Sequence, residues 1–269
     1  MKYFELIKKY ASDDEKKEMI LFIICELQQI TKTELYMRLN EEIPLGELKS
    51  LETKLKLYID KKIPGQYIVG YTYFYGMKIY VNKNVLIPRF ETEEVVEAGI
   101  NCLKDFINPC VVDVGTGSGC IALAIKKSIP TSCIYGIDIS RRALKVARKN
   151  AQGQHLDINF LYGNLLKNFS VKCDMIISNP PYIKKGEEVM KIVDKNEPHR
   201  ALYSKHNGLY HYEKILQQSL TVLKDQGVIV FEIAYNRKEE MIALASKYYQ
   251  NIKILKDIRN NNRIMIIRR

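Results

Sequence analysis

The stretch VVDVGTGSGCIALAIKK, residues 111–127, decides the fold of this chain. It begins with an apolar run that holds one acid, which is typical of a buried strand. Gly115, Gly117 and Gly119 follow, and glycines permit a tight turn and a close backbone approach to a ligand. A helix expected from near Ser118 presents free N–H groups at its beginning. Strand, glycine loop and helix in this order predict one unit of an α/β sheet with a ligand at the loop.

The spacing of the glycines narrows the class of ligand. A dinucleotide fingerprint of the G-x-G-x-x-G kind needs glycine at position 120, where this chain has Cys120. No Lys-Ser/Thr pair follows the loop, which excludes a nucleotide phosphate loop. Asp138 ends the next expected strand, where an acid can accept both hydroxyls of a ribose. The pattern favours a ligand with a ribose, while NAD and a tight turn without a ligand stay open.

From residue 88 onward, expected strands and helices alternate, which favours a mostly parallel sheet covered on both faces. The expected strands are 110–114, 133–137, 158–161, 173–178, 227–233, 252–256 and 263–267. The expected helices are 92–105, 118–128, 140–151, 208–223 and 237–248. Because only the turn DIRNNN separates the last two strands, we expect that pair to be antiparallel.

The N-terminal part has a different pattern. Residues 1–66 are predicted to form a bundle of three or four helices, with Ser12 and Asp13 placed to cap one of them. Residues 67–87 are dense in Tyr, Ile, Val and Phe around Gly76, which predicts a β-hairpin that links the bundle to a domain at 88–269.

Composition bounds the function. Of 269 residues, 46% are apolar and 27% are charged, the balance of a globular protein, and the longest apolar run is too short for a membrane span. The N-terminus is not a secretory signal, and six scattered cysteines predict reduced thiols, so we expect a cytoplasmic protein. Neither the cysteines nor the four histidines have metal-site spacing, so no metal is expected.

The net charge of +11 lies entirely beyond the N-terminal part. Residues 1–70 hold 12 Lys/Arg and 12 Asp/Glu, whereas residues 71–269 hold 30 and 19. A basic domain suggests an anionic partner such as RNA, DNA or a ribonucleoprotein-associated substrate. A generally lysine-rich composition is the alternative.

The segment NPPY, residues 179–182, ends the fourth expected strand of the sheet, at the edge where open α/β sheets bind ligands. Asn179 offers an amide oxygen, and Pro181 holds Pro180 extended and so fixes the direction of its carbonyl. Two fixed acceptors suit a substrate –NH2 group, and the ring of Tyr182 can stack on a planar target. A chance turn is the alternative.

The glycine loop with Asp113 two residues before it resembles the first motif of S-adenosylmethionine-dependent methyltransferases. The resemblance implies that Gly115–Gly119, with Thr116 and Ser118, bind this cofactor together with Asp113 and Asp138. It also implies that Asn164 and Leu165, after the third strand, lie at the adenine. NPPY is then a signature of methylation at planar exocyclic nitrogens.

Nearly the whole chain resembles the release factor glutamine methyltransferases, which methylate the glutamine of the Gly-Gly-Gln motif in class 1 peptide chain release factors. The local pieces that carry the resemblance are YFYGMKIYVNKNVLIPRFETEEVVE (73–97), VVDVGTGSGCIALA, NPPYI, EPHRAL (197–202) and KDIRNNNRIMI. It implies a seven-stranded Rossmann-like methyltransferase sheet, mostly parallel with the last strand antiparallel, beside a substrate-recognising N-terminal bundle and a β-hairpin linker.

The resemblance also implies site residues. Asn179, Pro180, Pro181 and Tyr182 would hold the glutamine amide, with Asn179, Pro180 and Tyr182 as the catalytic residues and Asn179 also in contact with the cofactor. Arg89, Glu91 and Thr92 would lie near the entrance to the active site, with Glu197 and Pro198 in a loop over the substrate. Helix capping by residues 89–93 and an ordinary turn at Glu197-Pro198 are the alternatives. Phe90 and Asn164 depart from the family, which usually has proline and aspartate there.

We therefore expect a monomeric enzyme that methylates a release factor glutamine and does not require direct nucleic acid binding. An adenine-amino methyltransferase of nucleic acids is the first alternative, which NPPY and the charge both allow. A non-catalytic cofactor-binding or scaffold protein is the second.

Overall fold

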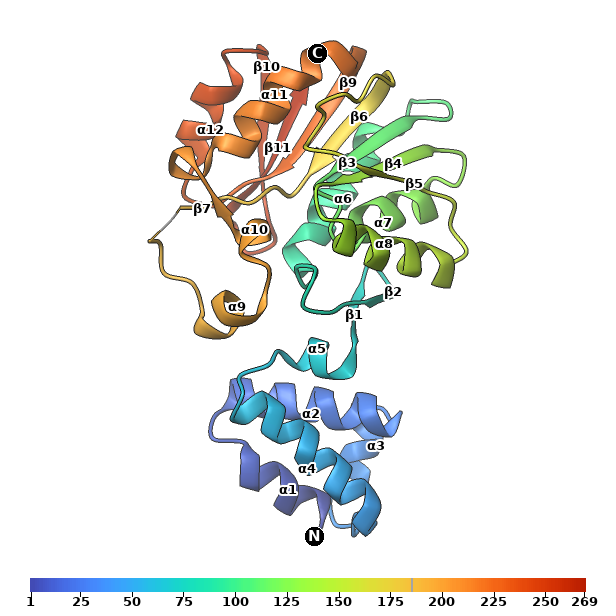
Figure 1. Cartoon of the computed structure of the whole chain (residues 1–269), viewed down its shortest axis with the longest axis vertical. Coiled ribbons are helices and arrows are strands. Elements are labelled where there is room, and N and C mark those ends of the chain that lie inside the picture. Colours follow the sequence, from blue (N-terminus) through green and yellow to red (C-terminus); the bar gives the residue numbers. More distant parts are fainter. Residues whose placement is uncertain (185) are drawn as a thin grey trace. The chain divides into compact units, whose positions relative to one another are not determined.

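The computed structural model describes residues 1–184 and 186–269 (Figure 1). The chain divides into two compact units. One unit comprises Met1–Tyr71 and Val189–Asn196, and the other comprises Thr72–Glu188 and Glu197–Arg269. The unit that holds the sheet carries the candidate site, so the first unit is described only briefly.

The first unit is helical, as the apolar spacing predicts. Its helices are α1 (Tyr3–Tyr10), α2 (Asp14–Gln28), α3 (Lys32–Met37), α4 (Leu45–Ile59), α5 (Gly65–Val69) and α9 (Lys191–Asn196). Asp13 caps α2 by accepting a 2.8 Å hydrogen bond from the Lys16 amide. Apolar side chains three and four residues apart form the core, among them Leu6, Ile20, Ile24, Leu51 and Leu55. The structure has more short helices here than the expected three or four.

The expected hairpin consists of β1 (Tyr71–Phe74) and β2 (Met77–Tyr80), and all of its strand residues except Tyr71 belong to the second unit. The sheet that follows contains β3 (Cys110–Val114), β4 (Cys133–Asp138), β5 (Asn159–Tyr162), β6 (Cys173–Ser178), β9 (Leu223–Glu232), β10 (Asn251–Lys256) and β11 (Asn262–Arg268). The helices and short elements between them are α6 (Phe90–Cys102), α7 (Cys120–Ser128), α8 (Arg141–Gly153), β7 (Ile183–Lys184), α10 (His199–Leu202), β8 (Tyr203–Ser204), η1 (His206–Gly208), α11 (Tyr210–Val222) and α12 (Lys238–Ala245).

The strand order is β10-β11-β9-β6-β3-β4-β5. Strands β9, β6, β3, β4 and β5 are mutually parallel, and β11 is antiparallel to both of its neighbours. This confirms the expected fold class and the antiparallel last strand. The chain passes from β3 outward to β5 and then returns to β6 on the other side of β3. The carboxyl ends of β3 and β6 therefore form a topological switch point, where sheets of this kind bind ligands.

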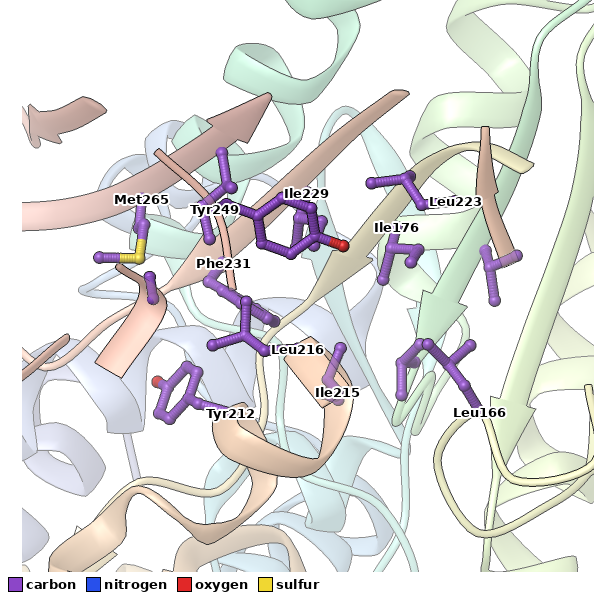
Figure 2. Packing of buried hydrophobic residues seen from close by; sticks show 14 of the residues in the cluster. Leu166, Ile176, Tyr212, Ile215, Leu216, Leu223, Ile229, Phe231, Tyr249 and Met265 are labelled. Atoms are coloured by element: carbon purple, nitrogen blue, oxygen red, sulfur yellow. The ribbon is translucent and has the colours of Figure 1, made fainter. Parts of the chain in front are cut away.

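Alternate residues of each strand face opposite layers of helices, because the side-chain period of a strand is two. Ile176 of β6 packs in the cluster that contains Tyr212 and Leu216 of α11, as Figure 2 shows. Its neighbours Met175 and Ile177 lie instead against Gly99 of α6. Both faces of the central strand are thus buried, which explains its apolar run from Met175 to Ile177.

Three element boundaries differ from the predicted ones for identifiable reasons. Helix α7 begins at Cys120 and not near Ser118, because Gly119 has a left-handed conformation with φ of 83°. Strand β9 begins at Leu223, which pairs with Cys173 before the register shifts. Helix α12 ends at Ala245, three residues early, and tighter turns then carry Tyr249 into the core.

Candidate active site

The two halves of the candidate site lie on neighbouring strands. The glycine loop follows β3 and NPPY follows β6, which is paired with β3 in parallel. Ser178, the last residue of β6, donates a 2.6 Å hydrogen bond from Oγ to the carbonyl oxygen of Val114, the last residue of β3. The tertiary structure therefore brings together two segments that are about 60 residues apart in the sequence.

The glycine loop is held by its own backbone amides. The N–H groups of Gly115 and Thr116 both donate to the carbonyl oxygen of Ile137, at 2.8 and 3.0 Å. The N–H of Gly117 donates to Oδ2 of Asp138 at 2.9 Å. Positive φ angles at Gly115, Gly117 and Gly119 make this backbone path possible, since residues with a Cβ atom adopt such angles much less readily than glycine. The loop is thus fixed against the end of β4 by hydrogen bonds within the protein.

Asp113 is completely buried at the end of β3. Its Oδ2 accepts from the Thr116 hydroxyl at 2.6 Å and from the Ala122 amide at 3.3 Å. Its Oδ1 has no partner among the residues that the structure describes. Burial raises the pKa of Asp113 to about 7, an effect that the Thr116 hydrogen bond opposes. An orphaned carboxylate oxygen fits a cationic amino group such as that of S-adenosylmethionine, which would supply the missing donor.

Asp138 lies at the carboxyl end of β4 and is half-buried. Its Oδ2 accepts from Gly117 and its Oδ1 accepts from the Ser140 amide at 2.7 Å. Burial raises the pKa of this carboxyl, while both backbone hydrogen bonds oppose the rise. Because a carboxylate has about four lone-pair sites, each oxygen can still accept one ribose hydroxyl. Asp138 can therefore orient the loop and bind a sugar together.

Asn150 of α8 is a residue that the sequence did not single out. Its Oδ1 accepts from the Tyr80 amide at 2.7 Å, and its Nδ2 donates to the carbonyl oxygens of Tyr80 and Ser118, at 3.0 and 2.8 Å. This buried amide therefore joins the hairpin strand β2 to the glycine loop. The sequence predicted only that Asn150 lies in the helix expected at 140–151.

Asn164 and Leu165 come shortly after β5 in the sequence. The segment lies next to the end of β4, because the Gly163 amide donates a 3.1 Å hydrogen bond to the Asp138 carbonyl oxygen. Asn164 is exposed, and Leu165 is half-buried with φ of 56°. Both residues therefore lie beside Asp138, as the resemblance implies. Contact of either residue with adenine stays a prediction.

Asn179 follows β6 and is half-buried. Its Nδ2 donates to the Thr92 hydroxyl at 3.2 Å, and that hydroxyl donates to Oε2 of Glu232 at 2.6 Å. Thr92, expected near an entrance, is only 3% exposed, and Glu232 at the end of β9 is 2% exposed. Three residues, one from α6, one from the segment after β6 and one from β9, thus form one chain of hydrogen bonds. Glu232 carried no sequence signal, because a single acid at a strand end has no distinctive spacing.

The rest of NPPY is firmly held. Pro180 is buried, and Pro181 and Tyr182 are half-buried. Burial, and after it the nearby Glu232 carboxylate, raises the pKa of Tyr182 to about 12, so its hydroxyl stays protonated at neutral pH. Burial lowers the pKa of His211, and a hydrogen bond to the Pro181 backbone partly opposes this effect. His211 therefore supports the proline segment as a neutral ring, although its place in the sequence did not suggest this role.

Arg89 and Glu197 contact each other, although 108 residues separate them in the sequence. Glu197 is buried, and its carboxylate accepts from Arg89 Nη2 at 2.6 Å and from the Ile87 amide at 3.1 Å. Glu91 pairs instead with Arg259 of the β10–β11 turn at 3.3 Å. Pro198 precedes α10 as its N-cap. Whether these residues also touch a substrate stays a prediction.

Two features of the described residues bear on other functions. Within 1–184 and 186–269, no helix combines the length and apolarity needed to cross a membrane. The same part of the chain holds no group of three or more His, Cys, Asp or Glu side chains arranged to bind a metal ion.

Solved methyltransferases share the fold of this chain, which is the Rossmann-like fold of that class. A methyltransferase from Pyrococcus furiosus superposes with a TM-score of 0.54 at 15% identity, over 72% of this chain and 89% of that chain. A 16S rRNA methyltransferase from Thermus thermophilus gives 0.55 at 14% identity, over 74% of this chain and 49% of that chain. The family model described as "Methyltransferase small domain" matches residues 96–197.

Curated relatives narrow the class to one family. The release factor glutamine methyltransferase of Enterococcus faecalis is 39% identical over 98% of both chains. That of Flavobacterium psychrophilum is 37% identical over 94% of this chain and 92% of its own. That of Streptococcus pneumoniae is 35% identical over 99% and 98%. The chain belongs to the release factor glutamine methyltransferase family. It is therefore an S-adenosylmethionine-dependent methyltransferase, which confirms the expected enzyme class and cofactor.

Proposed function

We propose that this enzyme transfers a methyl group to the side-chain amide nitrogen of the glutamine in the Gly-Gly-Gln motif of class 1 peptide chain release factors. Membership of the family supports the reaction. The observation that carries the proposal to particular residues is the junction of NPPY and the glycine loop through Ser178 and Val114. It brings two amide acceptors beside the loop where the cofactor would bind.

The cofactor half of the site consists of Asp113, the glycine loop and Asp138. When bound, S-adenosylmethionine supplies an electrophilic methyl group on a sulfonium. The orphaned Oδ1 of Asp113 is the acceptor for its amino group, and Asp138 is the acceptor for its ribose hydroxyls. The loop N–H groups of Gly115, Thr116 and Gly117 are already engaged within the protein. Carboxylates, not backbone donors, therefore do the recognition, which suits a cofactor without phosphates.

The substrate half consists of Asn179 and the carbonyl of Pro180. A glutamine amide is a poor nucleophile, because its nitrogen lone pair is delocalised into the carbonyl. Two acceptors that hold both N–H hydrogens favour a geometry in which the lone pair points at the methyl group. Alignment of this kind contributes several kcal/mol to rate acceleration, on the order of effects known from intramolecular reactions.

The reaction needs no strong base at its start. A bond forms between the amide nitrogen and the methyl carbon, the carbon–sulfur bond breaks, and the nitrogen then loses one proton to solvent. Tyr182 is unsuited to accept that proton, because its pKa of about 12 keeps the phenol protonated. Its half-buried ring instead provides a flat surface beside the amide.

The wider setting belongs to the same proposal. We expect the protein to act as a cytoplasmic monomer on the release factor, without a nucleic acid partner and with residues 1–66 contacting the substrate. The charge of +11 leaves nucleic acid as the competing substrate.

The test uses purified protein, labelled cofactor and a class 1 release factor, followed by mass spectrometry of the peptide that contains Gly-Gly-Gln. We expect this peptide to gain the mass of one methyl group, and a release factor with Gln replaced by Glu in that motif to remain unlabelled. Label in added DNA or RNA, with none in the release factor, would overturn the proposal. Sedimentation of the same protein sample measures its molecular mass and so tests the expectation that the protein is a monomer.

A further inference from the structure

The chain of hydrogen bonds from Asn179 through Thr92 to Glu232 has a defined direction. A threonine hydroxyl has one hydrogen and can donate to one partner only. In the structure it donates to Glu232, so it can only accept from Asn179, and it accepts from the Nδ2 side of the amide. The amide oxygen Oδ1 of Asn179 is thereby directed away from Thr92.

This direction matters because an asparagine amide can rotate by half a turn at little steric cost. The two orientations differ in whether oxygen or nitrogen faces a neighbour, and hydrogen bonds decide between them. With the oxygen turned toward Thr92, the –NH2 of Asn179 would face the substrate –NH2, and two donors would oppose each other. Only the observed orientation offers an acceptor to the substrate.

Glu232 is the fixed end of this chain. It is buried at the end of β9, where the Tyr212 hydroxyl also donates to its backbone carbonyl at 2.7 Å. The charged groups around its carboxyl are Arg263 of β11, Arg89 before α6 and Glu91 of α6, and the titratable Tyr182 phenol, which is neutral, also lies nearby. Burial raises the pKa of Glu232 to about 7. The ionised carboxylate can only accept, which forces the Thr92 hydroxyl to donate to it.

We propose that Thr92 and Glu232 are positioning residues, which fix the amide of Asn179 with its oxygen toward the substrate –NH2. This inference rests on the proposed function, since it assigns how that site orients its acceptor. Thr92 then acts through Asn179 and does not touch the substrate.

The test compares Thr92→Val, which keeps the shape and removes the hydroxyl, with Thr92→Ser, which keeps the hydroxyl. We expect Thr92→Val to lower kcat by about 10- to 100-fold, with little change in KM for the release factor or in cofactor affinity. Thr92→Ser should retain most of the activity. Ser219→Ala is the matched control, because it removes a buried hydroxyl in α11, far from NPPY in the sequence. Unchanged kcat in Thr92→Val, or equal loss in both Thr92 variants, would overturn the inference.

A second variant, Glu232→Gln, tests the same chain of hydrogen bonds by the pH dependence of kcat. If Glu232 is protonated, it can donate to Thr92, whose hydroxyl can then donate to Oδ1 of Asn179 and favour the wrong orientation. We therefore expect kcat of the wild type to rise as pH increases through the neutral range, and this rise to be lost in Glu232→Gln. The same pH profile in both proteins would contradict the inference.

The orientation of Asn179 can also be measured without catalysis. The side-chain amide signals of Asn179 in 15N nuclear magnetic resonance report its hydrogen-bond partners. We expect them to shift in Thr92→Val and to stay in place in Ser219→Ala. If the Asn179 signals do not shift in Thr92→Val, Thr92 does not orient the Asn179 amide, and this result is independent of which substrate the enzyme methylates. Failure of the wild type to label a release factor would instead refute the proposed function.

Discussion

The hydroxyl of Ser178 donates a 2.6 Å hydrogen bond to the carbonyl oxygen of Val114. Each residue is the last of its strand, β6 and β3, and each is immediately followed by one half of the candidate site. Both residues are buried, so the bond is protected from water. It fixes the distance between the glycine loop and NPPY, on which transfer between a bound cofactor and a bound amide depends.

Asn179→Ala should abolish most of the turnover and leave cofactor binding nearly unchanged. The variant removes one of the two acceptors for the substrate –NH2, and loss of one aligned catalytic hydrogen bond typically lowers kcat by about 100-fold or more. Methyl transfer to a release factor and calorimetric binding of the cofactor measure the two effects. The exposed Asn101→Ala in α6 serves as a control. Wild-type turnover in Asn179→Ala would refute the role assigned to Asn179.

Cofactor affinity should rise as pH increases from about 5.5 to 7. The pKa of the buried Asp113 is raised to about 7 in the free protein, whereas a cationic amino group favours the ionised carboxylate. Binding therefore releases a proton from Asp113, and a release of protons on binding makes the affinity increase with pH. Calorimetry in two buffers measures that proton. Asp113→Asn should bind more weakly and without this pH dependence; an unchanged pH profile would exclude Asp113 as the group responsible.

The same raised pKa predicts how the stability of the free protein depends on pH. Between the unfolded pKa of 3.8 and the folded pKa of about 7, the folded state of Asp113 holds more protons than the unfolded state. The free energy of unfolding therefore falls as pH rises through this window, by at most about 1.4 kcal/mol per pH unit from this group. Urea unfolding at several pH values gives the free energy of unfolding at each pH. This free energy should change less with pH in Asp113→Asn than in the wild type.

Asn150→Ala should lower stability and weaken cofactor binding together. The change leaves the Tyr80 amide and the Tyr80 and Ser118 carbonyl oxygens without their buried partner. Loss of such partners costs about 2–4 kcal/mol in the free energy of unfolding. Denaturant unfolding and cofactor titration measure the two effects, again with Asn101→Ala as the control. Normal cofactor affinity in a destabilised variant would mean that Asn150 supports the fold and not the loop.

Arg89→Ala should destabilise the protein even where no substrate is present. Glu197 has a side chain only 1% exposed, and the change would leave its carboxylate with the Ile87 amide as a donor but without a counter-ion. Because Arg89 is itself about one third exposed, we expect a loss of about 1–3 kcal/mol. Thermal unfolding measures this loss. Lys9→Ala, which breaks the more exposed pair with Glu52, should change the melting temperature much less.

Phe90→Pro should be tolerated. Phe90 is the first residue of α6 and is 61% exposed, and proline is favoured at the first position of a helix, where the amide has no helical acceptor. The melting temperature should therefore stay the same or rise slightly. A large loss of stability would show that the Phe90 side chain or its amide makes a stabilising contact in this protein. If activity alone falls, the aromatic ring contacts the substrate.

Sequence patterns predicted much of this architecture because their signals are local. Mostly apolar stretches at 110–114 and 173–178, each with one aspartate, indicated buried parallel strands, and the structure has β3 and β6 at these residues. Glycines at 115, 117 and 119 indicated the turn, since glycine adopts positive φ angles without a steric cost, and all three glycines have positive φ. The ends of α7 and β9 differ from the predicted ones, because the left-handed Gly119 delays the start of α7 and β9 begins before a shift in register with β6.

By itself, the sequence indicated the class of enzyme through its resemblance to known methyltransferases, because Asp113 with the glycine loop, Asp138 and NPPY are each short local segments. Tertiary structure alone decided which residues support them. Glu232 lies 53 residues beyond Asn179, and Thr92 lies 87 residues before it, yet one hydroxyl joins all three. Such contacts arise where strands and a helix meet at one end of a sheet, and no local pattern of residue types encodes which side chains will meet there.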